Sequence, residues 1–272
     1  MSFTSCPPTP SGRTHPRAEE SFSRLLDARQ GSAPLTETRW PWLLLHHDRR
    51  RSATAPVPRL VEPQRNPLQW STIWRQRLSG PLPGRAAQGR FEPELSFGRH
   101  FGPPPPDARR ATVIALFYPD EQGAWHLPLT IRPTTMQTHA GQISLPGGGV
   151  MPGETSDAAA LRELHEELGV DLTAVELLGE LTPLYLYNSN YYVSAWVALM
   201  TERPLFRPDA REVAELLEVP WSALGDSRHH GVHSRRARGI ACKVPHIRWG
   251  RHRIWGATSM ILGELLALSD GS

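Results

Sequence analysis

The pattern of apolar positions predicts a β-hairpin at the start of a compact region near residue 111. Residues 111–118 form a run that is rich in β-forming residues and bounded by turn signals, which is typical of a buried strand. Residues 124–132 form a second such run, and the turn residues between the two runs predict that they pair as a hairpin.

The rest of the compact region carries both strand and helix patterns. Strand patterns recur around 175–186 and at 191–199, and a short strand followed by a helix from about Thr258 comes last. Residues 213–224 mix the two signals, so their structure is left open. Strands mixed with a few helices predict an α/β or α+β layered domain.

The N-terminal part has a different composition. Residues 1–65 are rich in Pro, Ser, Thr and Arg and lack sustained periodicity, which predicts a disordered or loosely packed tail. Residues 66–78 have the spacing of a short amphipathic helix, and the Pro-rich remainder of 66–110 predicts an irregular connector. We therefore divide the chain into this tail, the helix with its connector, and a main domain at 111–272.

Composition narrows the expected partners and setting. Hydrophobic residues make up 39% of the 272 residues, and the formal net charge is only +3. No polybasic tract is long enough to predict nucleic-acid binding, and no apolar run approaches the ~20 residues of a membrane helix. The two cysteines, Cys6 and Cys242, cannot build a disulfide framework, so a reduced, cytoplasmic setting is expected.

The pattern of residues 155–169 predicts a helix that carries several closely spaced glutamates. Thr155 or Ser156 can cap its start, and Gly169 can end it. At ~100° per residue, three leucines share one face and should be buried, while three glutamates lie nearly opposite. The leucines are Leu161, Leu164 and Leu168, and the glutamates are Glu163, Glu166 and Glu167.

The three glutamates stand at i, i+3 and i+4, so their carboxylates are neighbours and repel one another. A divalent cation reverses that repulsion, and Mg²⁺ and Mn²⁺ prefer such oxygen ligands. Arg162 precedes Glu166 by one turn and can hold it, together with Glu154, by charge-assisted hydrogen bonds. Four glycines let the backbone approach a metal or a phosphate closely: Gly147, Gly148, Gly149 and Gly153.

This segment resembles the Nudix box, Gly-x5-Glu-x7-Arg-Glu-U-x-Glu-Glu-x-Gly-U, in which U is a bulky aliphatic residue. Every motif position is matched: Gly148, Glu154, Arg162, Glu163, Leu164, Glu166, Glu167, Gly169 and Val170. The resemblance implies a Nudix-type α/β/α sandwich with a mixed central sheet, preceded here by an irregular Pro/Arg-rich N-terminal extension. It also implies a hydrolase that cleaves a nucleoside diphosphate linked to another moiety.

The resemblance further implies a role for each charged residue of the box. Glu163, Glu166 and Glu167 are the expected ligands of Mg²⁺ or Mn²⁺, with the Gly147 carbonyl as an additional ligand. Glu154 and Arg162 are expected to orient these ligands, so catalysis is expected to depend on both. Glu166 is the first candidate for the general base that activates water. Three further candidates lie outside the box: Glu212, Glu215 and His139.

Residues 129–148 resemble the motif of Nudix coenzyme A diphosphatases, Leu-Leu-Thr-x-Arg-Ser/Ala-x3-Arg-x3-Gly-x3-Phe-Pro-Gly-Gly. The matching positions are Leu129, Thr130, Arg132, Gly141, Pro146, Gly147 and Gly148, and the departures are Pro128, Pro133, Gln137 and Leu145. The resemblance implies cleavage of CoA or an acyl-CoA to 3′,5′-ADP and (acyl-)4′-phosphopantetheine. The expected substrate-binding residues are Arg132, Gly141, Gln142 and Gly148.

Other functions stay open at this point. Gln137 replaces an arginine that could hold a phosphate of CoA, which keeps NADH, ADP-ribose and dinucleoside polyphosphates as alternative substrates. A non-catalytic nucleotide-binding regulator is a third alternative, and a homodimer is left open.

Two sets of side chains outside the motifs are candidates for substrate contacts. A 3′-phosphate of CoA needs a cationic partner, either Arg132 or a residue of the Arg- and His-rich stretch 228–253, which is otherwise typical of a solvated loop. The candidates in that stretch are Arg235, Arg236, Arg238 and Arg251. Aromatic residues that could stack on adenine are Tyr185, Tyr187, Tyr191, Tyr192 and Trp196.

Overall fold

The computed structural model describes residues 66–94, 96–134, 141–237 and 239–270, and the predicted tail at 1–65 lies outside them. The helices are α2 (Pro67–Leu78), α3 (Gly84–Gln88), α4 (Ser156–Leu168), α5 (Trp221–Gly225) and α6 (Ala257–Ser269). Short 3-10 turns are η2 (Gly89–Phe91), η3 (Arg99–Phe101), η4 (Leu172–Ala174) and η5 (Ser227–His229). The strands are β1 (Arg109–Pro119), β2 (Trp125–Ile131), β3 (Ile143–Ser144), β4 (Gly147–Gly149), β5 (Glu176–Glu180), β6 (Leu184–Leu186), β7 (Tyr191–Leu199), β8 (Glu215–Pro220), β9 (His230–Ala237), β10 (Ile240–Trp249) and β11 (His252–Trp255).

A mixed sheet forms the centre of the fold. Its strand order is β3-β2-β1-β7-β5, with β4 beside β1, β6 beside β7 and β8 beside β2. Strands β1 and β7 run parallel, whereas β1 pairs antiparallel with both β2 and β4. The predicted hairpin of 111–118 and 124–132 is thereby confirmed, with Tyr118 opposite His126 next to the turn.

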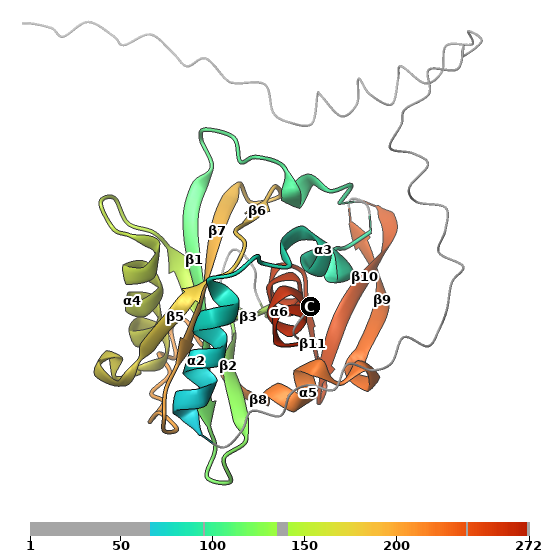
Figure 1. Cartoon of the computed structure of the whole chain (residues 1–272). Helices are drawn as coiled ribbons and strands as arrows, with labels where there is room; N and C mark the ends of the chain where they lie inside the picture. Colours follow the sequence, from blue (N-terminus) through green and yellow to red (C-terminus); the bar gives the residue numbers. More distant parts are fainter. Residues whose placement is uncertain (1–65, 95, 135–140, 238, 271–272) are drawn as a thin grey trace, which may run out of the picture. The chain divides into compact units, whose positions relative to one another are not determined.

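Strand β1 contributes to a core on each face of this sheet, because successive side chains of a strand point to opposite faces. Ile114 and Leu116 pack in one cluster with Leu164 of α4. Ala115 and Phe117 pack in the other cluster, which includes residues of α2 and α6. Helices α4 and α6 accordingly lie on opposite sides of the central strands (Figure 1). The predicted α/β/α sandwich with a mixed central sheet is confirmed.

The predicted helix at 66–78 is confirmed and is part of the core. Asn66 caps α2 by accepting a hydrogen bond from the backbone N–H of Leu68 at 3.0 Å. Trp70 and Trp74 are only 2% and 0% exposed, and the Trp70 ring stacks on Trp125 of β2. The segment just before the main domain therefore completes one face of the sheet.

The prediction of an irregular connector after α2 is wrong for residues 84–91, which form α3 and η2 and pack on α6. The fully buried Glu264 of α6 accepts hydrogen bonds from the Gly84 backbone N–H at 3.0 Å and from Gln88 Nε2 at 2.7 Å. These are charge-assisted bonds from residues 176 to 180 positions away in the sequence. A local pattern could not have shown this partner.

The C-terminal third also departs from expectation in one place. Residues 213–224, whose pattern mixes strand and helix signals, contain the strand β8 followed directly by α5. The stretch 228–253 is not a solvated loop: its described residues form a second, three-stranded antiparallel sheet with the order β11-β10-β9. Ile247 and Ile254 of this sheet are buried in the core that contains α6, which explains why the stretch is ordered. Among the described residues, we find no helix with the length and apolar content needed to cross a membrane.

Candidate metal centre and substrate site

Helix α4 places the acidic residues of the box. Thr155 stands at its N-cap position, and Gly169 ends it in the left-handed conformation with φ +64°, as predicted. Leu164 and Leu168 are fully buried as expected, whereas Leu161 is only partly buried. Glu163 and Glu167, however, are also buried, at 9% and 2% exposure.

The glycine-rich strand β4 covers the glutamate face of α4. Gly147 and Gly148 lie opposite Val113 and Thr112 of β1. A Cβ atom on Gly148 would lie 2.5 Å from the Glu163 carboxylate, and one on Gly147 would overlap the Thr112 carbonyl. Only glycine lets the backbone come this close, so β4 can pass directly over the acidic side chains.

Three carboxylates converge at this place: Glu163, Glu167 and Glu212, each with an oxygen within 4.8 Å of the others. Glu212 comes from the segment between β7 and β8. That segment docks on the end of α4, where the Leu168 carbonyl accepts from the Arg207 N–H at 2.7 Å and the Glu167 carbonyl accepts from the Asp209 N–H at 2.9 Å. The sequence pattern offered Glu212 only as a base candidate outside the box; the fold brings it into the acidic group.

The electrostatics of this acidic group are unfavourable without a cation. Burial, together with the neighbouring Glu163 and Glu212 carboxylates, raises the pKa of Glu167 to about 8 against the opposing effects of Arg132 and of a hydrogen bond from the Gly147 backbone. Burial also raises the pKa of Glu163. Glu167 Oε2 is buried and has no hydrogen-bond partner in the described part of the chain. Hard oxygen donors with an unused buried lone pair fit Mg²⁺ or Mn²⁺.

Arg162 organises the surrounding residues. Its Nε and Nη2 donate to the two oxygens of Glu154 at 2.9 and 3.0 Å, and its Nη1 donates to Glu163 at 2.8 Å and to Glu166 at 2.9 Å. Nη2 also donates to the Gly149 carbonyl at 3.0 Å. The two bonds from Arg162 to Glu154 lower the pKa of Glu154, whose carboxylate also accepts a hydrogen bond from the Met151 N–H. The guanidinium thus ties the loop before α4 to the helix, as the sequence suggested.

Glu166 lies differently from its two neighbours in the box. Its side chain is 48% exposed and pairs with Arg162, and it is not one of the three carboxylates that converge. In this structure Glu212 takes the third place in the acidic group that the sequence assigned to Glu166.

The expected substrate-binding residues Arg132, Gly141 and Gln142 are brought together by backbone hydrogen bonds. The Gly141 N–H donates to the Arg132 carbonyl at 3.0 Å, and the Arg132 N–H donates to the Gln142 carbonyl at 3.1 Å. Arg132 Nη1 lies 4.0 Å from Glu167 Oε1, and Arg132 Nε is buried without a partner in the described residues. Gln137 and His139 lie outside the described residues.

The remaining candidates have partners elsewhere. Glu215 pairs with Arg251 at 3.0 Å and lies 3.6 Å from His252 Nε2. Four of the five aromatic candidates engage neighbouring side chains: Tyr185 donates to Asn190, Tyr187 and Tyr191 lie under Arg99 and Arg109, and Trp196 Nε1 donates to Ser156 at the start of α4. The fifth, Tyr192, lies on β7 opposite Tyr185 of β6.

Comparison with known proteins identifies the class of protein that this fold and site define. The NUDIX domain family model matches residues 108–240. A Nudix hydrolase named NudL from Photorhabdus laumondii subsp. laumondii is 38% identical over 141 residues, which cover 51% of this chain and 74% of the relative. NudL from Yersinia pestis is 37% identical over 142 residues, which cover 51% of this chain and 70% of the relative.

The chain therefore belongs to the Nudix hydrolases. It is a pyrophosphohydrolase that acts on a nucleoside diphosphate derivative.

Solved structures also resemble the chain, at lower similarity. RenU, a Nudix hydrolase from M. smegmatis, is 24% identical with a TM-score of 0.35, covering 42% of this chain and 71% of RenU. A MutT protein from Methanosarcina mazei Go1 is 17% identical with a TM-score of 0.41, covering 61% of this chain and 99% of that protein.

Proposed function

We propose that this Nudix hydrolase cleaves the pyrophosphate bond of CoA or an acyl-CoA in the presence of Mg²⁺ or Mn²⁺. The observation that supports this proposal most is the position of Arg132. It belongs to the segment that resembles the CoA diphosphatase motif, and its guanidinium lies next to Glu167 with a buried Nε that has no partner among the described residues. An arginine with unused donors beside a cation-binding group suits a phosphate of the substrate.

In this proposal, Glu163, Glu167 and Glu212 hold the cation, because they are the carboxylates that converge. The Gly147 carbonyl is kept as an additional ligand. When bound, Mg²⁺ or Mn²⁺ supplies charge neutralisation at the phosphates and lowers the pKa of water. Arg132 and the backbone of Gly141, Gln142 and Gly148 orient the substrate.

Glu166 is the proposed proton acceptor. It lies one helical turn from Glu163, is half exposed, and interacts with Arg162 through only one of its carboxylate oxygens. Its other oxygen has no partner among the described residues and is in a position to accept a proton from water that approaches from solvent. Arg162 holds this carboxylate close to the cation-binding group, while Glu154 holds Arg162 in place.

A second substrate class is favoured by one residue. Gln137 stands where the CoA motif has an arginine, and a neutral amide cannot supply the charge that a phosphate of CoA would meet there. Hydrolysis of NADH, ADP-ribose or a dinucleoside polyphosphate is therefore the alternative.

A substrate panel separates the two proposals. Purified full-length protein is incubated with Mg²⁺ or Mn²⁺ and with CoA, acetyl-CoA, NADH, ADP-ribose or diadenosine polyphosphates, and the products are read by mass. We expect 3′,5′-ADP and 4′-phosphopantetheine from CoA as the fastest reaction. Fast turnover of ADP-ribose or NADH without turnover of CoA would show that the CoA assignment is wrong.

A further inference from the structure

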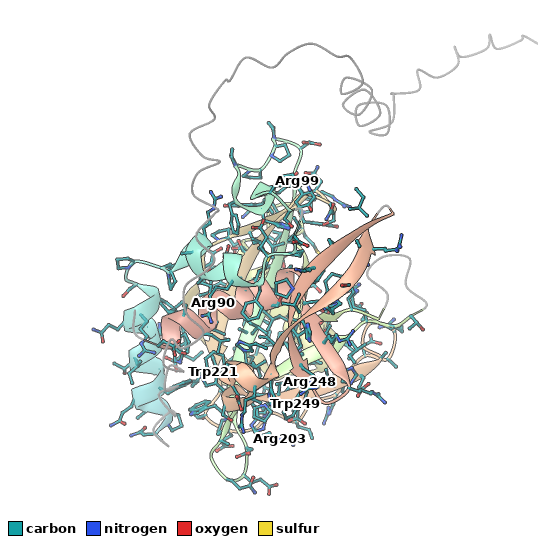
Figure 2. The ribbon with its side chains drawn as sticks, turned by 90° about the vertical axis from the view of Figure 1, so that its right-hand side faces the viewer. Arg90, Arg99, Arg203, Trp221, Arg248 and Trp249 are labelled. Atoms are coloured by element: carbon teal, nitrogen blue, oxygen red, sulfur yellow. The ribbon has the colours of Figure 1, made fainter. Side chains whose placement is uncertain are left out.

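The three-stranded sheet has one face that is strongly basic. Its side chains alternate along the strands, so that His246 and Arg248 of β10 share a face with the residues opposite them, Trp255 and Arg253 of β11. On β9, His233 lies opposite Val244 and Arg235 lies opposite Cys242, which puts both on this same face. We call the group Arg235, Arg248, Arg253, His233 and His246 the basic face. Figure 2 labels Arg248, which lies at the end of β10 that is far from the β9–β10 turn.

The charge on this face is not compensated. Arg248 and Arg253 are directly opposite each other on antiparallel strands, where like charges destabilise a sheet. Within the described residues, neither these two arginines nor Arg235 forms an ion pair with a carboxylate. Many other arginines of the chain do so, including Arg75, Arg162, Arg203, Arg211, Arg228 and Arg251.

A histidine pair lies among these arginines. The Nδ1 atoms of His233 and His246 are 3.2 Å apart, so one ring donates a single N–H to the other. His246 is only 8% exposed. Burial lowers the pKa of both rings, and the charges of Arg253 lower both further, with Arg235 acting on His233 and Arg248 on His246. This pair, of which His246 is buried and His233 partly exposed, thus has cationic neighbours and can offer N–H donors without adding full charge.

An aromatic ring adjoins the same group. The Arg235 guanidinium lies 4.4 Å from the centre of the Trp255 ring, and the His233 ring packs edge-on to it. Cationic and N–H donors beside an indole ring are the features that recognise a phosphorylated nucleoside.

The basic face belongs to an element that is close to the catalytic segment. Strand β11 lies against β3, and Thr258 at the start of α6 donates to the Ile143 carbonyl of β3 at 3.0 Å. Ile143 pairs with Ile131, the residue that precedes Arg132. Only β3 therefore separates β11 from β2, a distance on the order of 10 Å between strands. The sheet that carries the basic face is therefore adjacent to the strands that position Arg132.

We propose that the basic face binds a phosphate monoester of the substrate, distinct from the pyrophosphate that is cleaved. This inference builds on the proposed function, under which the group is the 3′-phosphate of CoA. A dianionic phosphate offers three acceptor oxygens and neutralises the opposed Arg248 and Arg253. Of the arginines that the sequence offered in this stretch, Arg235 lies on the basic face, whereas Arg236 lies on the opposite face and Arg251 is paired with Glu215. The structure adds Arg248, Arg253 and the two histidines to that set.

Two nucleotides test this proposal by calorimetry on the full-length protein: adenosine 3′,5′-bisphosphate and adenosine 5′-monophosphate. We expect the bisphosphate to bind more tightly. Arg253→Gln and Arg235→Gln should each weaken its binding by about tenfold or more, while changing binding of the monophosphate by less than about twofold. Arg75→Gln, which removes the same charge on α2, is the matched control and should alter neither.

The folding of the variants is checked by thermal unfolding. Arg253→Gln should unfold at the same or a higher temperature than the wild type without ligand, because it removes repulsion from Arg248. Equal affinity of the wild type for both nucleotides, or equal loss of both in the variants, would overturn the phosphate subsite. The substrate panel is read separately: failure of CoA turnover together with an Arg253-dependent preference for the bisphosphate would reject the CoA assignment and keep the subsite.

Discussion

The carboxylate of Glu167 and the guanidinium of Arg132 face each other at 4.0 Å without forming a hydrogen bond. Glu167 is 2% exposed, and both Glu167 Oε2 and Arg132 Nε are buried with no partner in the described part of the structure. Leaving such groups unpaired costs about 1–3 kcal/mol or more each. The arrangement is therefore suited to two ligands of opposite charge, a cation on Glu167 and a phosphate on Arg132.

Glu167→Gln should abolish most of the activity while keeping the fold. The amide offers a weaker ligand to a hard cation, so we expect turnover to fall by about 100-fold or more. Without metal, the variant should unfold at the same temperature as the metal-free wild type or at a higher one, because the substitution removes a crowded, desolvated carboxylate. Hydrolysis assays and thermal unfolding measure the two effects, with the exposed Glu202→Gln as control. Unchanged activity of Glu167→Gln would contradict the proposed metal site.

Two adjacent glycines provide a matched pair of variants. A methyl group on Gly148 would lie 2.5 Å from the Glu163 carboxylate, whereas one on Gly149 meets nothing within 4 Å. Gly148→Ala should therefore displace Glu163 and lower Mg²⁺ affinity and activity by roughly 10–100-fold, and Gly149→Ala should leave both near the wild-type level. Titration of Mg²⁺ in the hydrolysis assay measures this difference. Equal effects of the two variants would show that close approach to Glu163 is not what requires glycine.

Metal binding should depend on pH through Glu167, whose pKa is raised from 4.5 to about 8 by burial. Between pH 4.5 and about 8, Glu167 is protonated in the folded, metal-free protein but ionised in the unfolded chain. The free energy of unfolding of the metal-free protein should therefore fall as the pH rises through this range. A cation needs the ionised carboxylate, so affinity should rise toward pH 8 and binding should release a proton. Calorimetry in buffers of different ionisation enthalpy detects that proton. The wild type should release it, and Glu167→Gln should release less.

Helix α2 should be required for stability of the main domain. Trp74 is fully buried, and its ring contacts Phe117 of β1 and Trp221 of α5. Trp74→Ala should lower the free energy of unfolding by about 3–5 kcal/mol. Leu68→Ala on the same helix, where the side chain is 71% exposed, should change it by less than about 0.5 kcal/mol. Denaturant unfolding of both variants measures this contrast, and equal small effects would mean that α2 is dispensable.

The sequence by itself determined the features that depend on short separations. The hairpin of β1 and β2, the strand β7 and the bounds of α4 follow from local periodicity, capping and turn residues. The spacing of Gly148, Glu154, Arg162 and the glutamates indicated the class of enzyme, because one helix and its preceding loop carry most of the site.

Only the tertiary structure decided which side chains meet across long separations. Glu212 joins Glu163 and Glu167 because the segment after β7 docks on the end of α4, and Glu166 stays outside because it faces solvent and Arg162. Residues 84–91 are helical because α6 supplies the buried Glu264 as their partner. The basic stretch after α5 is a sheet because α6 buries its Ile247 and Ile254. For Glu212 and for residues 84–91 the stabilising partner lies far away in the sequence, so no local pattern could reveal it.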